Sequence, residues 1–415
     1  MWNPGFRMDG FPDCASPFDF AQTGFVRATL ADQGANRPGK IRYPTLQRLF
    51  SYDAMERITQ KTDVDGAEGR VDGFSYDAVD RRKTATDANG KTRYYDYDAL
   101  GQIVQVKDPL GNAMSLLYDV RGNVIQVTDP NGQKTLFSYD QRNLLLSSTD
   151  PLGKAIHYRY DEHGWLLEIK QANGQAVGYD YDAAGRINRH QEYAADGTLQ
   201  KTVDYQYDAA DNLTGWNDGT VSATREYDDA DRLSSETIDY GDFSLTHAYT
   251  YHANNQIKTY TSPDGVTISY EYDALGQFER ATIPGEGQIA VTDWQWTSPK
   301  KVLLPGGTTQ FMDYDGFQSL TRLKVVDPGQ ITVFELQNQF GKLAEIKQSA
   351  ADGTPSDYRY DDATRLKSVD VPASPARNES FEYDAASNRT RDGRLGDAVW
   401  RYDAAGQLTQ RGILR

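Results

Sequence analysis

The stretch "YYDYDALGQIVQVKDPLGN", residues 94–112, contains the two patterns that decide the fold. It carries Y-D-x-x-G from Tyr97 and D-P-x-G from Asp108. Both patterns are typical of tight turns, because Asp accepts hydrogen bonds from nearby backbone groups, Pro fixes φ and Gly tolerates positive φ. The stretch therefore predicts two turns at opposite ends of one strand.

The Y-D-x-x-G pattern recurs along most of the chain, and five copies begin 21 residues apart, at Tyr97, Tyr118, Tyr139, Tyr160 and Tyr181. Further copies begin at positions 52, 76, 207, 227, 251, 272, 314, 360, 383 and 402, with degenerate copies at Trp296 and Gln337. D-P-x-G or a relative of it lies halfway between many of them, as at Asp129 and Asp150. Propeller blades need a period of about 40 to 50 residues, whereas 21 residues fit one β-hairpin.

Between the turns the residues alternate, which predicts strands of about 6 to 8 residues. Ile156, Tyr158 and Tyr160 share one face, and after the turn Trp165, Leu167 and Ile169 are expected to share a face. We predict an all-β fold of tandem antiparallel β-hairpins over residues 45–415. Residues 1–44 lack the repeat and are rich in Gly, Pro and Asp, so they are expected to form an N-terminal cap or linker.

The length of the strip limits its shape. About 17 hairpins give about 34 strands, which at ~4.8 Å per strand make a strip of roughly 160 Å. This predicts about one circuit of a shell ~50 Å across, in the form of an open spiral or a partial shell.

Composition excludes several classes of protein. The formal charge of −16, from 44 basic and 60 acidic residues, disfavours nucleic acid as a partner. No apolar run approaches the roughly 18 residues of a membrane span, and the N-terminus shows no signal peptide. The single cysteine, Cys14, cannot form an internal disulfide.

The acidic residues Asp96, Asp98 and Asp108 raise the question of an aspartic active site. Such a site needs two carboxylates that share a proton in a dry cleft, whereas turn carboxylates are normally solvated. Asp98 and Asp108 belong to turns at opposite ends of a strand, so we expect them to be structural.

Other kinds of site are also not indicated. The five histidines are scattered and no G-x-S-x-G occurs, which disfavours a Ser-His-Asp triad. The "DVDG" at Asp63 lacks the rest of a calcium loop, and no phosphate-binding loop occurs. We therefore predict no enzyme activity, no metal site and no cofactor.

Aromatic side chains offer one candidate binding surface. Trp165 and Trp216, with neighbouring tyrosines, are candidates for ligand binding, for instance to sugar rings. The alternative is that these rings stack along the strip as its core, and we favour that alternative.

The repeated pattern resembles the YD-repeat or RHS-repeat family, which includes bacterial Rhs polymorphic toxins, the cocoon components of Tc toxin complexes, wall-associated proteins and teneurins. The resemblance covers roughly residues 45 to 410. It implies that the strip coils into a spiralling hollow shell. On this resemblance the repeat-turn residues are Tyr97, Asp98, Gly101, Tyr118, Asp119, Gly122, Tyr160, Asp161, Gly164, Tyr181, Asp182, Gly185, Tyr272, Asp273 and Gly276.

The resemblance implies a non-catalytic structural role, in which a secreted or cell-surface shell encloses or presents a partner, such as a toxin domain or another cargo polypeptide. The alternative is an adhesin surface that binds carbohydrate or protein. Toxin-type relatives end their repeats in a self-cleavage signature similar to "RYYDYDALGQIVQVKDPLGN" from Arg93. Here D-P-x-G recurs at Asp129 and Asp150, Asn112 replaces an apolar residue, and about 300 residues of further repeats follow. We therefore interpret this stretch as an ordinary repeat.

Overall fold

The structure is a computed structural model that describes residues 27–29, 38–66, 68–393 and 398–413. These residues contain 36 strands and two 3-10 turns, η1 (Pro305–Gly307) and η2 (Pro375–Arg377). The strands are β1 (Arg27–Thr29), β2 (Lys40–Arg42), β3 (Gln47–Tyr52), β4 (Ile58–Asp65), β5 (Glu68–Tyr76), β6 (Arg82–Thr86), β7 (Thr92–Tyr97), β8 (Ile103–Lys107), β9 (Ala113–Tyr118), β10 (Val124–Thr128), β11 (Lys134–Tyr139), β12 (Leu145–Thr149), β13 (Ala155–Tyr160), β14 (Leu166–Lys170), β15 (Ala176–Tyr181), β16 (Ile187–Tyr193), β17 (Leu199–Tyr207), β18 (Leu213–Asn217), β19 (Ser222–Tyr227), β20 (Leu233–Asp239), β21 (Ser244–Tyr251), β22 (Ile257–Thr261), β23 (Thr267–Tyr272), β24 (Phe278–Ile283), β25 (Gly287–Gln295), β26 (Ser298–Leu303), β27 (Thr309–Tyr314), β28 (Leu320–Val326), β29 (Thr332–Phe340), β30 (Ile346–Ala351), β31 (Thr354–Tyr360), β32 (Leu366–Asp370), β33 (Glu379–Tyr383), β34 (Arg389–Asp392), β35 (Ala398–Tyr402) and β36 (Leu408–Ile413).

Every strand pairs antiparallel with the next strand in sequence, so the chain forms one continuous strip. In the opening stretch Tyr95 lies opposite Val106 on the β7–β8 hairpin, and Val106 lies opposite Met114 on β9. The predicted all-β fold of antiparallel hairpins is therefore confirmed. Within the described residues no helix is long and apolar enough to cross a membrane.

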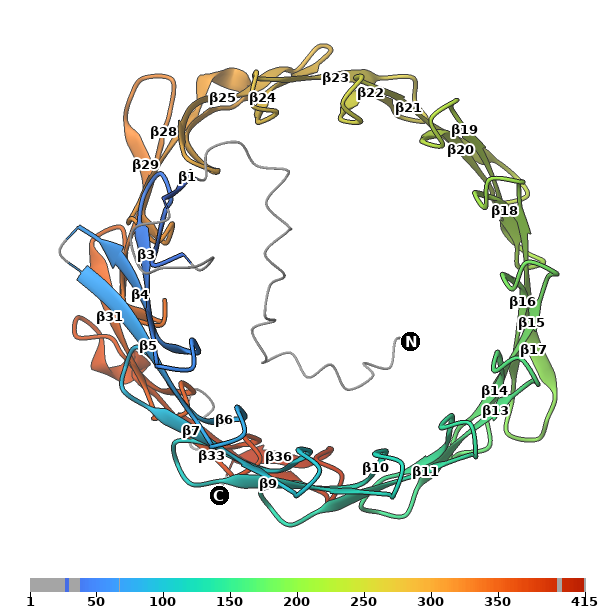
Figure 1. Ribbon diagram of the computed structural model, residues 1–415. Coiled ribbons are helices and arrows are strands. Elements are labelled where there is room, and N and C mark those ends of the chain that lie inside the picture. The colour runs from blue at the N-terminus through green and yellow to red at the C-terminus, as the bar shows by residue number, and fades with distance from the viewer. Residues whose placement is uncertain (1–26, 30–37, 67, 394–397, 414–415) are drawn as a thin grey trace.

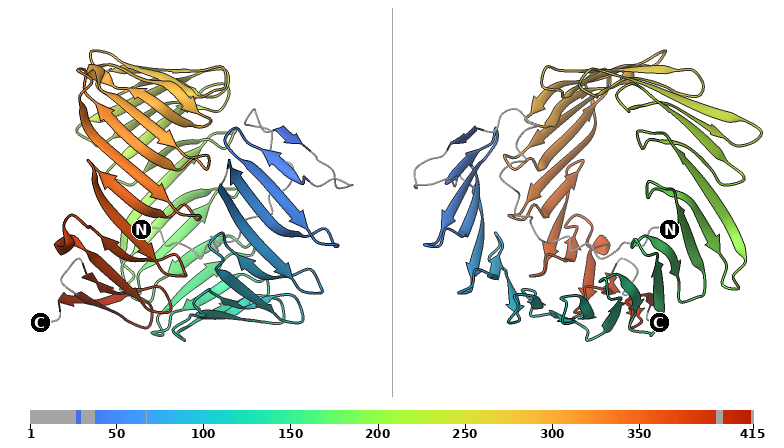
Figure 2. Two further views of the ribbon diagram at one scale, coloured as in Figure 1. Left: turned by 90° about the vertical axis from the view of Figure 1, so that its left-hand side faces the viewer. Right: turned by 45° about the vertical axis from the view of Figure 1, so that its right-hand side comes forward.

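The strip curves into a ring around a central space and then overlaps itself (Figure 1). Figure 2 shows that the ring is a spiral, in which the orange strands of the second circuit lie beside the blue strands of the first. Hydrogen bonds between the circuits join residues 251 to 256 apart, such as Asn131 with Asp384 and Asp65 with Gly316. One circuit therefore takes about 12 of the 21-residue repeats.

The prediction of about one circuit was wrong, whereas the diameter of ~50 Å stays a prediction. At two strands a repeat, one circuit takes about 24 strands. The 36 strands consequently make about one and a half circuits. Strand number fixes the length of a strip but not its curvature, and the curvature depends on local backbone irregularities.

These irregularities are β-bulges beside the Y-D-x-x-G turns. The register of β7–β8 shifts between Asp96 and Tyr97, and that of β13–β14 shifts between Arg159 and Tyr160. A bulge bends a strand and increases its twist, so one bulge in almost every hairpin curves the whole strip in the same sense.

The bulge also overturns part of the predicted alternation. Ile156, Tyr158 and Tyr160 share a half-buried face, as expected, while His157 and Arg159 are exposed. After the turn, however, Leu166 lies opposite Tyr160 and Ile169 lies opposite Tyr158. Leu167 is the extra residue of the bulge, and Trp165 belongs to the turn. A strict alternation of faces cannot predict the side chains beyond a bulge, because the extra residue has no partner across the hairpin and shifts the pattern by one.

The core follows the tyrosine-bearing face of the single-layered strip. Few of the described side chains are fully buried, and most of the buried apolar ones lie inside strands, as with Tyr95 at 8% and Leu116 at 4% exposure. Most other apolar residues on this face are half-buried. The stability of the fold therefore depends strongly on its backbone ladder and its turns.

Two degenerate repeats begin elsewhere than predicted. Trp296 lies in a tight turn between β25 and β26, with φ of 56°, rather than at the end of a strand. The second degenerate turn runs from Gly341 to Glu345, so Phe340 and not Gln337 takes the tyrosine position.

Most of the expected cap, residues 1–44, lies outside the described residues. Its strands β1 and β2 pair with each other, and β2 pairs with β3. The boundary at residue 44 stays a prediction.

Candidate functional site: the turns and the seam

The two turn patterns form the same five-residue turn. In the first, Oδ1 of Asp98 accepts hydrogen bonds from the backbone N–H groups of Leu100 and Gln102, both at 2.9 Å. In the second, Oδ1 of Asp108 accepts from Leu110 at 2.9 Å and from Asn112 at 2.8 Å. In both kinds of turn, therefore, Asp accepts hydrogen bonds from the backbone N–H groups two and four residues later, and Gly occupies the same position.

The fourth turn position has positive φ, which explains its glycines. Among the predicted turn residues, φ is 86° at Gly101, 90° at Gly122, 92° at Gly164, 83° at Gly185 and 77° at Gly276. Copies without glycine keep this conformation, with Asn143 at 66° and Asp211 at 69°. Asn and Asp are the residues that tolerate this region best after glycine.

The remaining predicted aspartates lie in equivalent turns. Oδ1 accepts from the backbone N–H two and four residues later at Asp119, Asp182 and Asp273, and from the N–H four residues later at Asp161. Each carboxylate thus closes its own turn. The structure does not bring these residues together at one site.

The candidate acidic cluster is also separated. Asp96 is exposed on β7 opposite Gln105, one residue before the bulge. Asp98 and Asp108 occupy the turns at opposite ends of β8, which runs from Ile103 to Lys107. The three carboxylates therefore cannot act on one bond.

The repeat tyrosines tie neighbouring hairpins together. The hydroxyl groups of Tyr97, Tyr118 and Tyr181 donate to the backbone oxygens of Arg82, Ile103 and Leu166, each at 2.8 Å. Each acceptor is the first residue after the preceding Y-D-x-x-G turn. Burial raises the pKa of Tyr118, Tyr160, Tyr181 and Tyr272 above the usual value.

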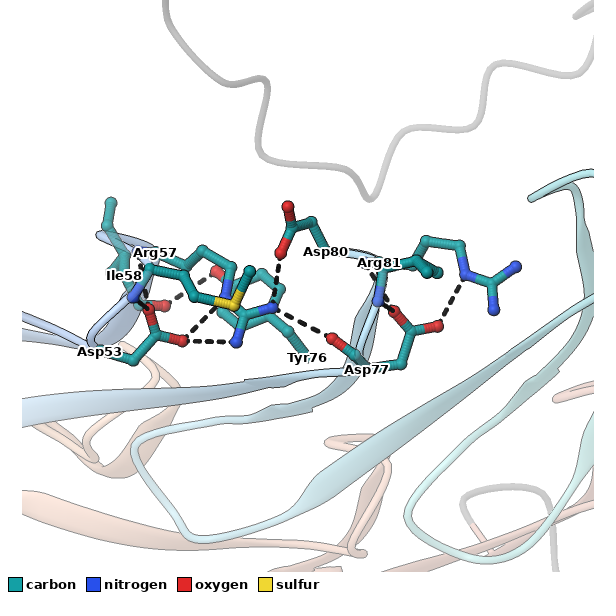
Figure 3. A network of polar contacts seen from close by, with 9 residues as sticks. Asp53, Arg57, Ile58, Tyr76, Asp77, Asp80 and Arg81 are labelled. Carbon is teal, nitrogen blue, oxygen red and sulfur yellow. Dashed lines mark hydrogen bonds and ion pairs between the residues drawn. The ribbon is translucent and has the colours of Figure 1, made fainter.

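An arginine at the fifth turn position adds a second tie, which sequence analysis missed (Figure 3). Arg57 donates from Nε to Oδ2 of Asp53 at 2.7 Å, and from Nη1 to the backbone oxygen of Asp77 at 3.0 Å and Oδ1 of Asp80 at 2.7 Å. Its guanidinium lies 4.8 Å from the ring centre of Tyr76. One planar cation therefore holds two turns and one aromatic ring.

The same arginine tie recurs, and its signal was present in the sequence as Y-D-x-x-x-R. The arginines that bond the aspartate of their own turn and the next turn's backbone are Arg57, Arg81, Arg186, Arg232 and Arg365. In other copies asparagine takes this position, as where Asn123 bonds both Asp119 and Asn143. The turn pattern leaves the residue after the glycine unspecified, and that residue is the arginine or asparagine of the tie.

The turn carboxylates are held in their ionised form. The side chain of Asn123 lowers the pKa of Asp119, and the guanidinium of Arg186 lowers the pKa of Asp182. In a tighter turn, the backbone N–H of Val221 and the ammonium of Lys201 lower the pKa of Asp218 to about 2. A carboxylate that already accepts several hydrogen bonds is a poor general acid or base near neutral pH.

The two candidate binding tryptophans lie on separate hairpins. The ring of Trp165 is 5.1 Å from that of His163 and 5.2 Å from that of Tyr181, measured between centres. Trp216 is half-buried on β18 between Tyr205 and Ala223 of the adjacent strands. The ring of Trp165 therefore packs against neighbouring rings, and a ligand-binding role for either tryptophan stays a prediction. Among the described residues no group of three potential metal ligands occurs.

The two circuits meet along a line of polar contacts that we call the seam. Turns of the D-P-x-G kind in the first circuit face Y-D-x-x-G turns in the second. The hydrogen bonds and ion pairs are Asn89 Nδ2 to Glu345 Oε1 at 3.3 Å, Lys91 Nζ to Asp362 Oδ1 at 2.6 Å, Asn131 Nδ2 to Asp384 Oδ2 at 3.0 Å, Arg70 Nη2 to Asp315 Oδ2 at 3.7 Å, and the Gly316 N–H to Asp65 Oδ2 at 2.7 Å. Four of these five contacts pair a donor from the first circuit with a carboxylate from the second.

Comparison with protein families gives a match over nearly the whole chain. The family model described as teneurin YD-shell matches residues 33–191 and 179–413. A search of the curated proteins finds no match.

Solved structures share the fold. The crystal structure of TcdB2-TccC3-TEV has a TM-score of 0.69 at 14% identity, over 88% of this chain and 24% of that chain. TcdB2-TccC3 without its hypervariable C-terminal region gives 0.70 at 14% identity, over 90% and 25%. The Photorhabdus luminescens Tc holotoxin pore gives 0.54 at 14% identity, over 89% and 26%. The chain thus spans about a quarter of the length of each of these structures.

Proposed function

The chain belongs to the teneurin YD-shell family, and on this premise we propose that it is a non-catalytic shell segment that encloses or presents a partner polypeptide, such as a toxin domain. The observation that carries the proposal is the winding of a single-layered strip around a central space, with a seam that joins successive circuits. A strip of this kind surrounds a volume instead of filling it.

A row of exposed apolar side chains supports a polypeptide partner. Four consecutive Y-D-x-x-G turns of the first circuit carry one each, with exposures of 56% at Met55, 65% at Val79, 78% at Leu100 and 99% at Val120. In the second circuit the comparable turn residues Phe317 and Leu343 are half-buried. These four turns lie on the edge of the first circuit opposite the one that meets the second circuit, and exposed apolar groups along one edge are typical of surfaces that contact another chain.

Electron microscopy of the purified protein tests the shell itself. We expect ring-shaped particles with low density at the centre and an overlap of two circuits over part of the ring. A solid globule or an extended rod would contradict the proposal.

A fused reporter tests enclosure. We expect a short unstructured reporter, fused after Arg415, to be cut by a protease more slowly than the same reporter fused to an unrelated globular protein of similar mass. Equal cleavage rates in the shell fusion and the control fusion would refute enclosure and leave the shell architecture intact.

The family and the neighbouring structures also guide a proposal on location. We place the protein outside the cytoplasm, secreted or at the cell surface, as an Rhs-type shell. Fractionation of the producing cells tests this placement, and recovery only from the cytosol of cells that secrete normally would contradict it.

A further inference from the structure

Two of the donors in the seam are asparagines that directly precede a glycine. Asn89 and Asn131 donate across the seam to Glu345 and Asp384, and a glycine follows each of the two asparagines. The sequence holds one further Asn-Gly pair, at Asn173. Asn-Gly is the step at which asparagine loses its amide most readily, because glycine has no side chain to obstruct attack by its own backbone nitrogen. Two bonds of the seam therefore depend on chemically labile groups.

The turns themselves do not need these asparagines. In a D-P-L-G copy of the same turn, leucine takes this position, and Oδ1 of Asp150 still accepts from the backbone N–H of Leu152 at 2.9 Å. Among the described residues, the side-chain amides of Asn89 and Asn131 bond only the second circuit. Asparagine at these two positions therefore serves the seam and not the turn.

The labile groups are accessible, and one hydrogen bond restrains each of them. Both asparagines and the glycines after them are exposed, and a Cβ built on Gly90 or Gly132 would meet no atom within 4 Å. The backbone N–H of Gly90 donates to the backbone oxygen of Asp87 at 2.8 Å, and that of Gly132 to Asp129 at 2.9 Å. The glycine nitrogen can react only when this bond opens, so the reaction is slow in the folded chain.

We propose that Asn89 and Asn131 are deamidation sites whose conversion opens the seam. The backbone nitrogen of the following glycine loses its proton and bonds to Cγ of the asparagine, while the amide nitrogen takes up a proton and leaves as ammonia. Water then opens the resulting cyclic imide at either carbonyl, which gives aspartate or isoaspartate. Each site consumes one water, releases one ammonia and gains one carboxylate. The inference does not depend on whether the shell encloses a polypeptide.

Each new carboxylate faces an old one that is held in place. Oε2 of Glu345 accepts from the backbone N–H of Leu343 at 2.8 Å, and its side chain is only 11% exposed. The two oxygens of Asp384 accept from the backbone and the side chain of Asn388 at 2.8 and 2.9 Å. Deamidation therefore replaces a hydrogen bond with repulsion between like charges. Isoaspartate also adds a methylene group to the main chain and so distorts the turn.

The reaction and the seam are coupled. Contact with the second circuit holds the amide and its turn, so a closed seam slows the reaction and an open seam speeds it. Conversion at one site weakens the seam and thereby favours conversion at the other. The spiral consequently loosens in one direction with time, without a cut in the chain.

Incubation of the full chain in heavy-oxygen water at mildly alkaline pH, followed by digestion and mass spectrometry, tests the chemistry. We expect heavy oxygen at Asn89 and Asn131, and faster backbone hydrogen exchange of the facing turns, residues 341–345 and 384–388, in the aged chain. The variant N89Q/N131Q keeps an amide donor but forms the cyclic imide far less readily, so its turns should keep their slow exchange. Absence of the label at both asparagines, while the urea-unfolded chain takes it up, would overturn the proposal.

Aspartate variants test the consequence without the wait. We expect N89D to speed the exchange of residues 341–345 about fivefold, and N131D that of residues 384–388, because each loses the bond across the seam. N173D is the matched control, since it adds the same charge beside a glycine but its amide bonds Gln175 of its own hairpin. N173D should leave both turns unchanged, and equal exchange of these turns in all three variants would overturn the proposal.

Discussion

Asp98 and Asp96 show how much a single position matters in this fold. The two carboxylates are two residues apart, yet Asp98 closes a turn through two backbone hydrogen bonds while Asp96 is exposed on β7. The turn assignment of Asp98 followed from recurrence, because only a structural residue needs to return every 21 residues. Chemistry at one site would not need a copy in every hairpin.

We predict that D98A lowers the free energy of unfolding by about 1–2 kcal/mol, because two backbone N–H groups lose their acceptor. D96A removes the same charge from an exposed strand position, and we expect a change below about 0.5 kcal/mol. Urea unfolding followed by circular dichroism measures both. Equal effects of the two variants would show that the turn hydrogen bonds do not matter.

Acid should destabilise the shell through the turn aspartates. Hydrogen bonds lower the folded-state pKa of Asp119 and Asp182, and that of Asp218 to about 2. Groups with a lowered folded pKa contribute stability that is fully present above the unfolded pKa of about 3.9 and lost as pH falls through the folded value. Thermal unfolding should therefore shift to lower temperature between about pH 5 and pH 2, and a constant midpoint across this range would contradict the assignment.

Each hairpin is held to the next by more than its backbone ladder. The tyrosine hydroxyl and the arginine at the fifth turn position both reach a backbone oxygen of a neighbouring hairpin. In a quasi-one-dimensional array such contacts between neighbours set the cooperativity of unfolding. In each Y-D pair, therefore, the Asp closes one turn and the Tyr joins two neighbouring hairpins.

We predict that Y118F lowers the free energy of unfolding by about 1 kcal/mol, because it removes the donor to the backbone oxygen of Ile103 and keeps the ring. Y94F, at a 48% exposed position, is the matched control and should change little. Chemical unfolding of both variants measures the difference. A loss of stability as large for Y94F would assign the effect to something other than the bond between hairpins.

We predict that R186K loosens the neighbouring turn. Lysine cannot bond Asp182, the backbone oxygen of Asp208 and Asp211 at once, as the guanidinium of Arg186 does. Exchange of the Asp208 and Asp211 amides should become several-fold faster. R189K, which alters an exposed pair with Asp204, should leave that turn unchanged, and unchanged exchange in R186K would contradict the role of the arginine tie.

The sequence was sufficient to predict the hairpin, its period and both turns, because turn chemistry is local and recurs. It was insufficient for the bulge, since the extra residue Leu167 is apolar and fits the alternating pattern as well as a paired residue would. It was also insufficient for Phe340 and Trp296, where the turn departs from its tyrosine marker. The seam could not be predicted, because it depends on residues about 250 positions apart coming together.

At the scale of the whole molecule the seam decides between a closed and an open strip. A strip of hairpins alone would be free to uncoil, because each hairpin contacts only its neighbours. The seam adds contacts between residues 245 to 271 apart, and most of these contacts are polar. The spiral is therefore held by few, spaced interactions, which makes its closure sensitive to the charges on both edges.

Zero-length carbodiimide coupling, followed by mass spectrometry of the digested monomer, tests the winding most directly. This reagent joins an ammonium group to a carboxylate only when the two are in contact, and Nζ of Lys91 lies 2.6 Å from Oδ1 of Asp362. We predict an intramolecular link between the peptides that contain Lys91 and Asp362, and its absence in K91R, which keeps the charge. Links from Lys91 only to carboxylates of its own and adjacent hairpins would contradict a spiral that overlaps itself after about 12 repeats.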